Sequence, residues 1–140
     1  MKTILLFFII PLSFLFASDT EWEALILEKM LESVSTKKSI VKVYTDDKIL
    51  ATELQKDKNF TVTDKCDECD FIVIKEPWKI NGCNKPEIVF DYHSYKKTPD
   101  AIGVFFWQKG RPTIRFSAQR LGRFGLKVNG ELKKFVSQKN

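Results

Sequence analysis

The sequence is poor in the residues that most often carry catalysis or bind metal ions. It contains one histidine and three cysteines in 140 residues, and it lacks the GxSxG, HExxH and glycine-rich phosphate-loop patterns of common enzymes. A single histidine cannot be assigned to a particular serine or acid from the sequence alone. We therefore expect a protein without enzymatic activity and without a cofactor.

Long apolar runs are scarce as well, and the one long run lies at the start of the chain. It covers the thirteen residues Ile4–Phe16, after the positive charge of Lys2 and before small and then acidic residues. This order is typical of a secretory signal peptide, whereas a membrane-spanning helix needs ~20 residues. We predict a signal peptide over residues 1–17 and a single domain over residues 18–140, with a retained N-terminal anchor as the alternative. Both alternatives place the protein in the periplasm.

Acidic residues are scarce in the last third of the chain. Between Ala101 and Asn140, nine lysines and arginines accompany one acid, Glu131, so the local net charge is +8. Between Ser18 and Asp100, 13 basic residues accompany 17 acids, a net charge of −4. A basic lobe can bind nucleic acid, anionic lipid headgroups or an acidic protein surface, and export argues against nucleic acid. The simpler alternative is that these side chains are solvated on helix surfaces.

Helical and strand patterns alternate along the chain. Helical spacing of apolar residues predicts helices over residues 19–34, 48–56, 118–123 and 130–137. Short β-branched and apolar runs predict strands over residues 39–45, 60–63, 71–74 and 87–92, and a hairpin of residues 101–108 with 113–116. A polar loop is expected over residues 93–100. The order predicts a single compact α/β domain, with α+β as the alternative, in which helices flank a mixed sheet of about five to six strands.

Asp46 and Asp47 are the only carboxylate pair at the end of a predicted strand. Open α/β sheets often bind ligands at the carboxyl ends of their strands, so a small-molecule-binding periplasmic module is one alternative function. Capping of the helix that follows explains the pair more simply.

The three cysteines predict one disulfide and one unpaired thiol. Cys83 lies in a turn-rich loop from which it could pair with Cys66 or with Cys69. Thiol redox catalysis needs a lowered thiol pKa, and four acids between residues 64 and 70 oppose the thiolate. Zinc binding is the other alternative, because these cysteines and His93 make up a three-sulfur, one-imidazole set. We expect a structural disulfide and no metal, since export makes oxidation compete with metal loading.

An aromatic run, Phe105-Phe106-Trp107, lies in the first strand of the predicted hairpin. Alternation along a strand gives two sets of side chains, with Phe105 and Trp107 on one face and Ile102, Val104 and Phe106 on the other. A central strand that is buried on both faces explains such a run. In the functional alternative, Phe105 and Trp107 are exposed beside Arg111 and Arg115, because large aromatic residues and arginine are typical interface anchors.

Segments of the chain resemble the YfiR-like family of small exported proteins. In the last third, the matching residues are Ala101–Val104, Gly110–Arg111, Ile114–Phe116, Leu121–Val128, Leu132 and Phe135. Upstream and in the same order, they are Ile40–Asp46, Cys69–Ile74 and Pro86–Asp91. The family pattern in the last third is a strand, a charged turn, a short Arg-Phe strand, a helix that ends before Gly-Leu-Lys, and a closing helix with spaced leucines.

The resemblance implies a YfiR-like sandwich with structural disulfides. The domain is expected to be trimmed, because only a loop stands between Ile74 and Ile88 where the family has a helix. The resemblance also implies a non-enzymatic regulator in a cyclic-di-GMP pathway. Members of the family repress an inner-membrane diguanylate cyclase by binding its periplasmic part.

The predicted contact surface for such a partner is the hairpin with its flanks. We expect Phe105 and Trp107 to act as anchors. The residues expected to recognise charge are Arg111, Arg115, Arg120 and Arg123. A homodimer and proximity to the membrane surface are both compatible with this interpretation.

Overall fold

The computed structural model describes residues 19–36, 39–76 and 83–138, so the signal peptide predicted over residues 1–17 lies outside the described part. The elements are α2 (Asp19–Val34), β1 (Val41–Thr45), α3 (Lys48–Gln55), β2 (Phe60–Thr63), the 3-10 helix η1 (Cys66–Glu68), β3 (Phe71–Ile74), β4 (Glu87–Val89), α4 (Tyr92–Lys97), β5 (Ala101–Gln108), β6 (Arg111–Ser117), α5 (Ala118–Arg123), the 3-10 helix η3 (Gly130–Phe135) and β7 (Val136–Ser137). None of the helices in these ranges has the length and apolar character that crossing a bilayer requires.

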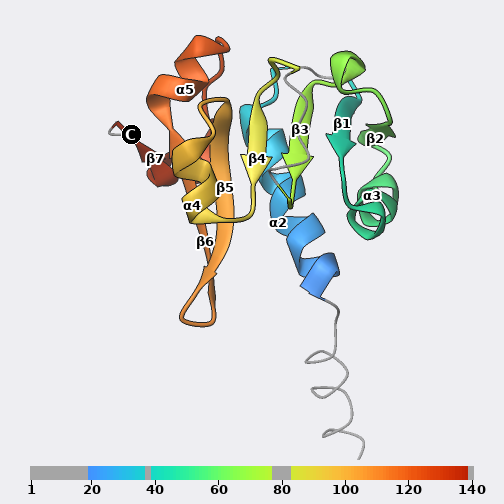
Figure 1. Ribbon diagram of the computed structural model, residues 1–140, viewed down its shortest axis with the longest axis horizontal. Helices are drawn as coiled ribbons and strands as arrows, with labels where there is room; N and C mark the ends of the chain where they lie inside the picture. The colour runs from blue at the N-terminus through green and yellow to red at the C-terminus, as the bar shows by residue number, and fades with distance from the viewer. Residues whose placement is uncertain (1–18, 37–38, 77–82, 139–140) are drawn as a thin grey trace, which may run out of the picture.

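The strands in the described residues form one mixed sheet, in the order β2-β1-β3-β4-β5-β6-β7 (Figure 1). The first five strands of this order are parallel to their neighbours, β6 is antiparallel to β5, and β7 is parallel to β6. The order of the parallel part is that of a doubly wound α/β sheet. The predicted α/β class is therefore confirmed, and the sheet is larger than expected because the chain adds β7.

Helices cover both faces of the sheet. On one face, α2 and α3 bury Leu27 and Leu50 in the main core. On the other face, α4 covers β4 and β5 through Tyr95, and the loop that contains Cys69 covers β3. Figure 1 shows α2 behind the sheet and α4 in front of it. Because the central strands are covered on both faces, β3 is buried along its whole length.

The segment after β4 was predicted incorrectly. A strand was expected to reach residue 92 and a polar loop to follow, but β4 ends at Val89 and residues 92–97 form α4. Asp91 begins this helix, because its carboxylate accepts a hydrogen bond of 2.9 Å from the Ser94 amide. The apolar run Ile88–Phe90 continues the strand pattern up to the residue before the helix cap Asp91. The sequence pattern therefore does not show where β4 ends and α4 begins.

The alternation expected along β5 is interrupted by a bulge. The register between β4 and β5 shifts after Ala101, so Ile88 lies opposite Gly103. Ile102 consequently joins Phe105 in the core below α2, whereas Val104 packs on the α4 face. The predicted face that grouped Ile102 with Val104 is therefore wrong. A β-bulge inserts one extra residue into a strand, so the side chains on its two sides no longer follow one alternation. No local sequence pattern predicts its position.

The C-terminal segment is also different from the helix expected over residues 130–137. It forms η3 and then the two-residue strand β7, in which Val136 lies opposite Phe116. Asn129 occupies the N-cap position of η3 without a capping hydrogen bond from its side chain, and its backbone amide donates a 2.8 Å hydrogen bond to the Ser33 carbonyl near the end of α2. This contact ties the last segment to the first helix.

Candidate functional site

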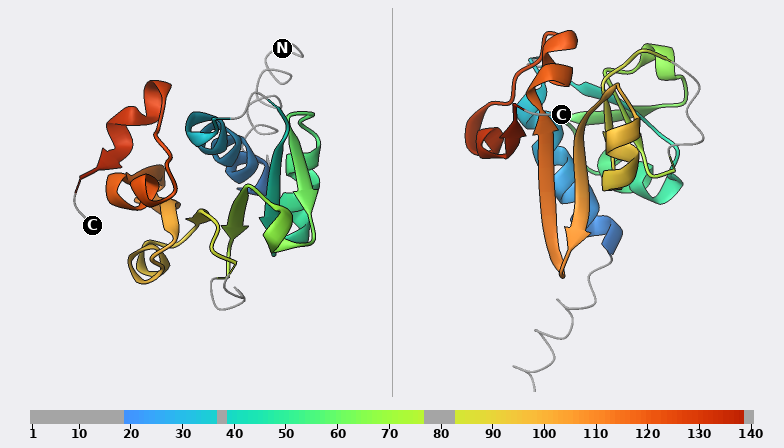
Figure 2. Two further views of the ribbon diagram at one scale, coloured as in Figure 1. Left: turned by 90° about the horizontal axis from the view of Figure 1, so that it is seen from above. Right: turned by 60° about the vertical axis from the view of Figure 1, so that its left-hand side comes forward.

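The β5–β6 hairpin projects beyond the end of β4 (Figure 1 and the right-hand view of Figure 2). Its turn is formed by Lys109 and Gly110, both with positive φ, 52° and 75°. Positive φ at both central residues is the mark of a type I′ turn, whose twist matches that of paired strands. The hairpin register sets Gln108 opposite Arg111 and Trp107 opposite Pro112. Trp107 and Pro112 therefore share one face of the projecting tip.

The two aromatic residues expected to act as anchors have different environments. Trp107 is 48% exposed, and its ring packs edge-on against Phe105 at 5.7 Å between centroids. Phe105 is only 2% exposed, and it also contacts the ring of Phe90 at 5.9 Å. The expectation that Phe105 is exposed is therefore wrong, because its ring belongs to the core. Trp107 extends that core to the surface.

The four arginines likewise separate into two kinds. Arg111 and Arg115 are exposed on β6, and the Arg115 guanidinium lies 5.3 Å from the centre of the Tyr92 ring. Arg123 is exposed at the end of α5 and donates to the Pro99 carbonyl, away from the hairpin. The hairpin therefore presents Arg111 and Arg115, but not Arg123.

Arg120 is a structural residue rather than a recognition residue. It is 9% exposed, and its guanidinium donates to the carbonyl oxygens of Tyr95 at 2.5 Å, Ala101 at 3.0 Å and Lys96 at 3.3 Å. Two of these carbonyls lie at the C-terminal end of α4, where helix carbonyls lack partners within the helix. Arg120 was expected on the contact surface, whereas the structure buries it and directs its guanidinium to these carbonyls.

A groove of about 730 Å³ lies along the outer side of β6. Its lining residues come from α2, β6, η3 and β7, and they are Ile26, Pro112, Thr113, Ile114, Arg115, Lys134, Phe135, Val136 and Ser137. Sequence reasoning did not identify this groove, because it depends on where η3 packs. The one sequence signal is Pro112, because a proline lacks an amide donor and is confined to the start of a strand or to an edge strand.

The cysteine pairing left open by the sequence is resolved by the fold. Cys66 and Cys83 form a disulfide with 6.1 Å between their Cα atoms. Cys69 is buried and unbonded to another cysteine, and its thiol donates to the Cys66 carbonyl at 3.0 Å. Burial raises the pKa of the Cys69 thiol, so this group is poorly suited to thiolate chemistry.

The disulfide removes Cys66 and Cys83 from the four residues considered as zinc ligands. Within residues 19–36, 39–76 and 83–138, no three His, Cys, Asp or Glu side chains are grouped so that they could hold a metal ion. His93 lies exposed in α4. The structural disulfide thus accounts for the cysteine pattern.

Asp46 and Asp47 lie at the carboxyl end of β1, and both carboxylates are engaged. Asp46 accepts hydrogen bonds from the backbone amides of Lys75 at 3.1 Å and Glu76 at 3.2 Å, just after β3. Asp47 caps α3 by accepting from the Leu50 amide at 2.9 Å, and its other oxygen lies 3.5 Å from the Lys75 ammonium. The pair therefore holds the ends of β1, β3 and α3 together.

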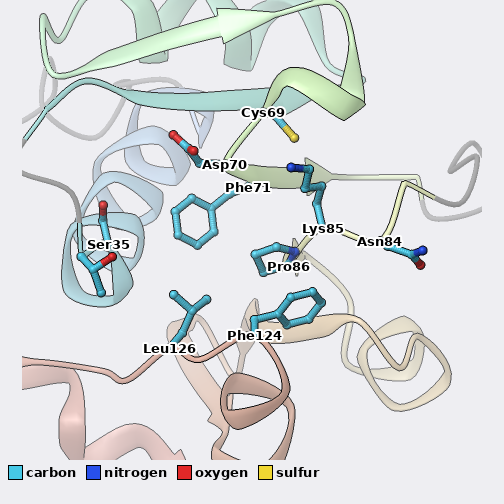
Figure 3. A pocket seen from close by; sticks show the side chains of 10 residues that line it. Ser35, Cys69, Asp70, Phe71, Asn84, Lys85, Pro86, Phe124 and Leu126 are labelled. Atoms are coloured by element: carbon cyan, nitrogen blue, oxygen red, sulfur yellow. The ribbon is translucent and has the colours of Figure 1, made fainter.

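Another cavity lies at the opposite ends of the strands. It has a volume of about 310 Å³ and lies where β3 and β4 begin. Figure 3 shows Phe71, Pro86, Phe124 and Leu126 around its apolar side, with Lys85 nearby. Volumes of this size accept small ligands.

The sequence was also compared with known proteins. No family model matches it, and no curated protein is significantly similar to it.

Proposed function

We propose that the protein is an exported, non-enzymatic regulator that binds the periplasmic sensor part of an inner-membrane signalling protein. The resemblance to the YfiR-like family makes a diguanylate cyclase of a cyclic-di-GMP pathway the favoured partner. The observation that carries the proposal is the exposed Trp107 on a projecting hairpin. Burial of its ring against a partner would remove a large apolar surface from water.

The surroundings of Trp107 support a protein partner rather than a solvent-facing role. Trp107 rests on the buried ring of Phe105, so the indole has a rigid base. Arg111 and Arg115 lie exposed on the neighbouring strand. Tryptophan and arginine are the residues most enriched among those that dominate binding energy at interfaces.

Cyclic-di-GMP measurement in cells that produce the protein naturally tests the proposal. Deletion of the gene is expected to raise the cyclic-di-GMP level, and the wild-type gene is expected to restore it. Trp107→Ala should behave as the deletion does, although the protein accumulates and folds. Ile40→Ala is the control, because Ile40 is 52% exposed just before β1 and away from the hairpin. Unchanged cyclic-di-GMP after deletion would contradict the proposed pathway.

A small-molecule-binding module is the second candidate, and the 310 Å³ cavity favours it. A ligand in this cavity should raise the melting temperature, because it binds the folded state alone. Thermal-shift screening with amino acids, nucleotides and organic acids tests this candidate. Leu126→Trp, which fills the cavity, should abolish any such shift.

A further inference from the structure

The outer edge of β6 is only partly covered. β7 consists of two residues, and it pairs with Phe116 and Ser117 alone. Within the described part of the chain, no strand pairs with residues 111–115 on the side away from β5. Such an edge can accept another strand, because its outward backbone groups have no partner in the sheet.

The hairpin register identifies the backbone groups on this open edge. In an antiparallel pair, hydrogen-bonded and non-hydrogen-bonded residue pairs alternate, and the residues that flank a two-residue turn are hydrogen-bonded. Arg111 flanks the turn, so the backbone groups of Pro112, Ile114 and Phe116 point away from β5. Phe116 is the residue that meets β7. The open edge therefore offers the Ile114 amide and carbonyl together with the Pro112 carbonyl.

The groove beside this edge supplies space for the side chains of an added strand. Its apolar lining residues are Ile26, Pro112, Ile114, Phe135 and Val136. Basic side chains lie on both sides of this edge: Lys134 is exposed and lines the groove, whereas Arg115 is exposed on the opposite face of β6 from Ile114, where its guanidinium lies over the Tyr92 ring. Arg111 lies at the start of the strand. An extended segment with alternating apolar and acidic residues matches this combination of a free edge, an apolar groove and a basic border.

A second copy of the chain matches the edge poorly. Antiparallel pairing of two β6 edges about Thr113 would place Arg111 of each copy opposite Arg115 of the other. Like charges directly opposite each other destabilise a strand pair. Pro112 also removes one donor from each edge, and proline and charged residues on edge strands prevent indiscriminate pairing.

From these observations we infer that the β6 edge and its groove are a docking site for an extended acidic segment of a partner protein, which adds to the sheet as a strand beside β6. The inference rests on the proposed function for the identity of the partner, but not for the chemistry of the site. Backbone hydrogen bonds at Ile114 supply affinity, and the groove and basic border select apolar and acidic side chains.

Binding of a defined peptide tests this inference directly. The probe is the capped peptide Glu-Val-Thr-Val-Glu-Val-Thr, and the control peptide carries lysine in place of glutamate. The protein is labelled with ¹⁵N during growth of the producing cells and is then isolated from their periplasm. We expect the acidic peptide to shift the amide signals of Ile114, Arg115 and Val136, and to bind about tenfold more tightly than the lysine peptide.

Two variants separate the edge from general electrostatic attraction. Ile114→Pro removes the outward amide without removing a hydrogen bond to β5, and it should abolish binding of the acidic peptide. Lys134→Glu is a second variant that keeps the test possible if Ile114→Pro fails to fold. It should weaken binding of the acidic peptide about tenfold. Lys127→Glu is the matched control, because Lys127 is exposed and lies outside the groove. It should leave peptide binding unchanged.

The outcomes distinguish this inference from the proposed function. Equal affinity for both peptides, amide shifts away from the edge, or a dimer formed through β6 would each overturn the inference. Restoration of the cyclic-di-GMP level by Lys134→Glu as fully as by the wild type would overturn the inference while leaving the proposed regulator intact. Specific peptide binding at the β6 edge, without any effect of gene deletion on cyclic-di-GMP, would support the docking site and contradict the proposed pathway.

Discussion

Two neighbouring aromatic residues on one face of β5 are expected to respond differently to truncation. Phe105→Ala removes a ring that is packed against Phe90 and Trp107, and such a change costs about 3–5 kcal/mol of unfolding free energy. Trp107→Ala should cost less than about 1 kcal/mol, because the indole is nearly half exposed. Urea unfolding of both variants measures this difference. Equal destabilisation would mean that Trp107 is a core residue.

Glu87 is a second residue whose environment leads to a prediction. Burial, together with the nearby Asp100 carboxylate, raises the pKa of Glu87 from 4.5 to about 7. The folded protein then binds more protons than the unfolded chain between these two values. The free energy of unfolding therefore falls as the pH rises from about 4.5 to about 7, and this loss persists at higher pH.

Glu87→Gln should remove this dependence on pH. Between pH 5 and pH 8 the free energy of unfolding of the wild type should fall by up to about 3 kcal/mol more than that of the variant, given 1.36 kcal/mol per unit of pKa shift. Urea unfolding at the two pH values provides the measurement. Parallel losses in the two proteins would contradict the assignment of the raised pKa to Glu87.

At the scale of elements, the N-terminus of α4 depends on one capping side chain. Asp91 accepts hydrogen bonds from both the amide and the hydroxyl of Ser94, at 2.9 and 2.8 Å. Asp91→Ala should cost about 1 kcal/mol of unfolding free energy. Asp91→Asn is the control, because an asparagine side chain retains a capping oxygen, and it should cost much less. A loss of equal size in both variants would show that the charge, and not the cap, matters.

Elements with strong local signals were predicted well from the sequence. α2 has apolar residues at helical spacing from Leu27 to Val34, and the structure gives the predicted bounds 19–34. α4 was missed, because Asp91 follows an apolar run that continues the strand pattern. The bulge in β5 was missed because it arises from the pairing with β4, which is a tertiary contact. Local periodicity carries no information about such a contact.

At the scale of the whole molecule, the disulfide joins the segment before β3 to the segment after it. Cys66 and Cys83 are separated by 17 positions, and closure of such a loop contributes about 3 kcal/mol through the unfolded state. Reduction should therefore lower the free energy of unfolding by about this amount. Peptide mapping of the oxidised protein should find Cys66 joined to Cys83 and Cys69 free. A Cys69–Cys83 peptide would contradict the pairing.

The candidate site was predictable only in part, because the sequence does not show which of its residues are buried. The sequence identified the hairpin, Trp107 and the arginines of β6 as surface candidates. It did not distinguish Arg111, which is exposed, from Arg120, which is buried against the carbonyls of α4. Residue type alone does not reveal burial when it is set by packing between elements distant in the chain. The groove beside β6 depends on the same kind of long-range packing.

Site-specific photo-crosslinking tests the central claim most directly. A photoreactive amino acid at position 107 in producing cells should crosslink to an inner-membrane protein that carries a periplasmic sensor domain. The same amino acid at position 40, which is exposed away from the hairpin, should not form this product. Crosslinking at position 107 only to a second copy of the chain, or an equal yield of the product from both positions, would contradict the assignment of the hairpin as the partner-binding surface.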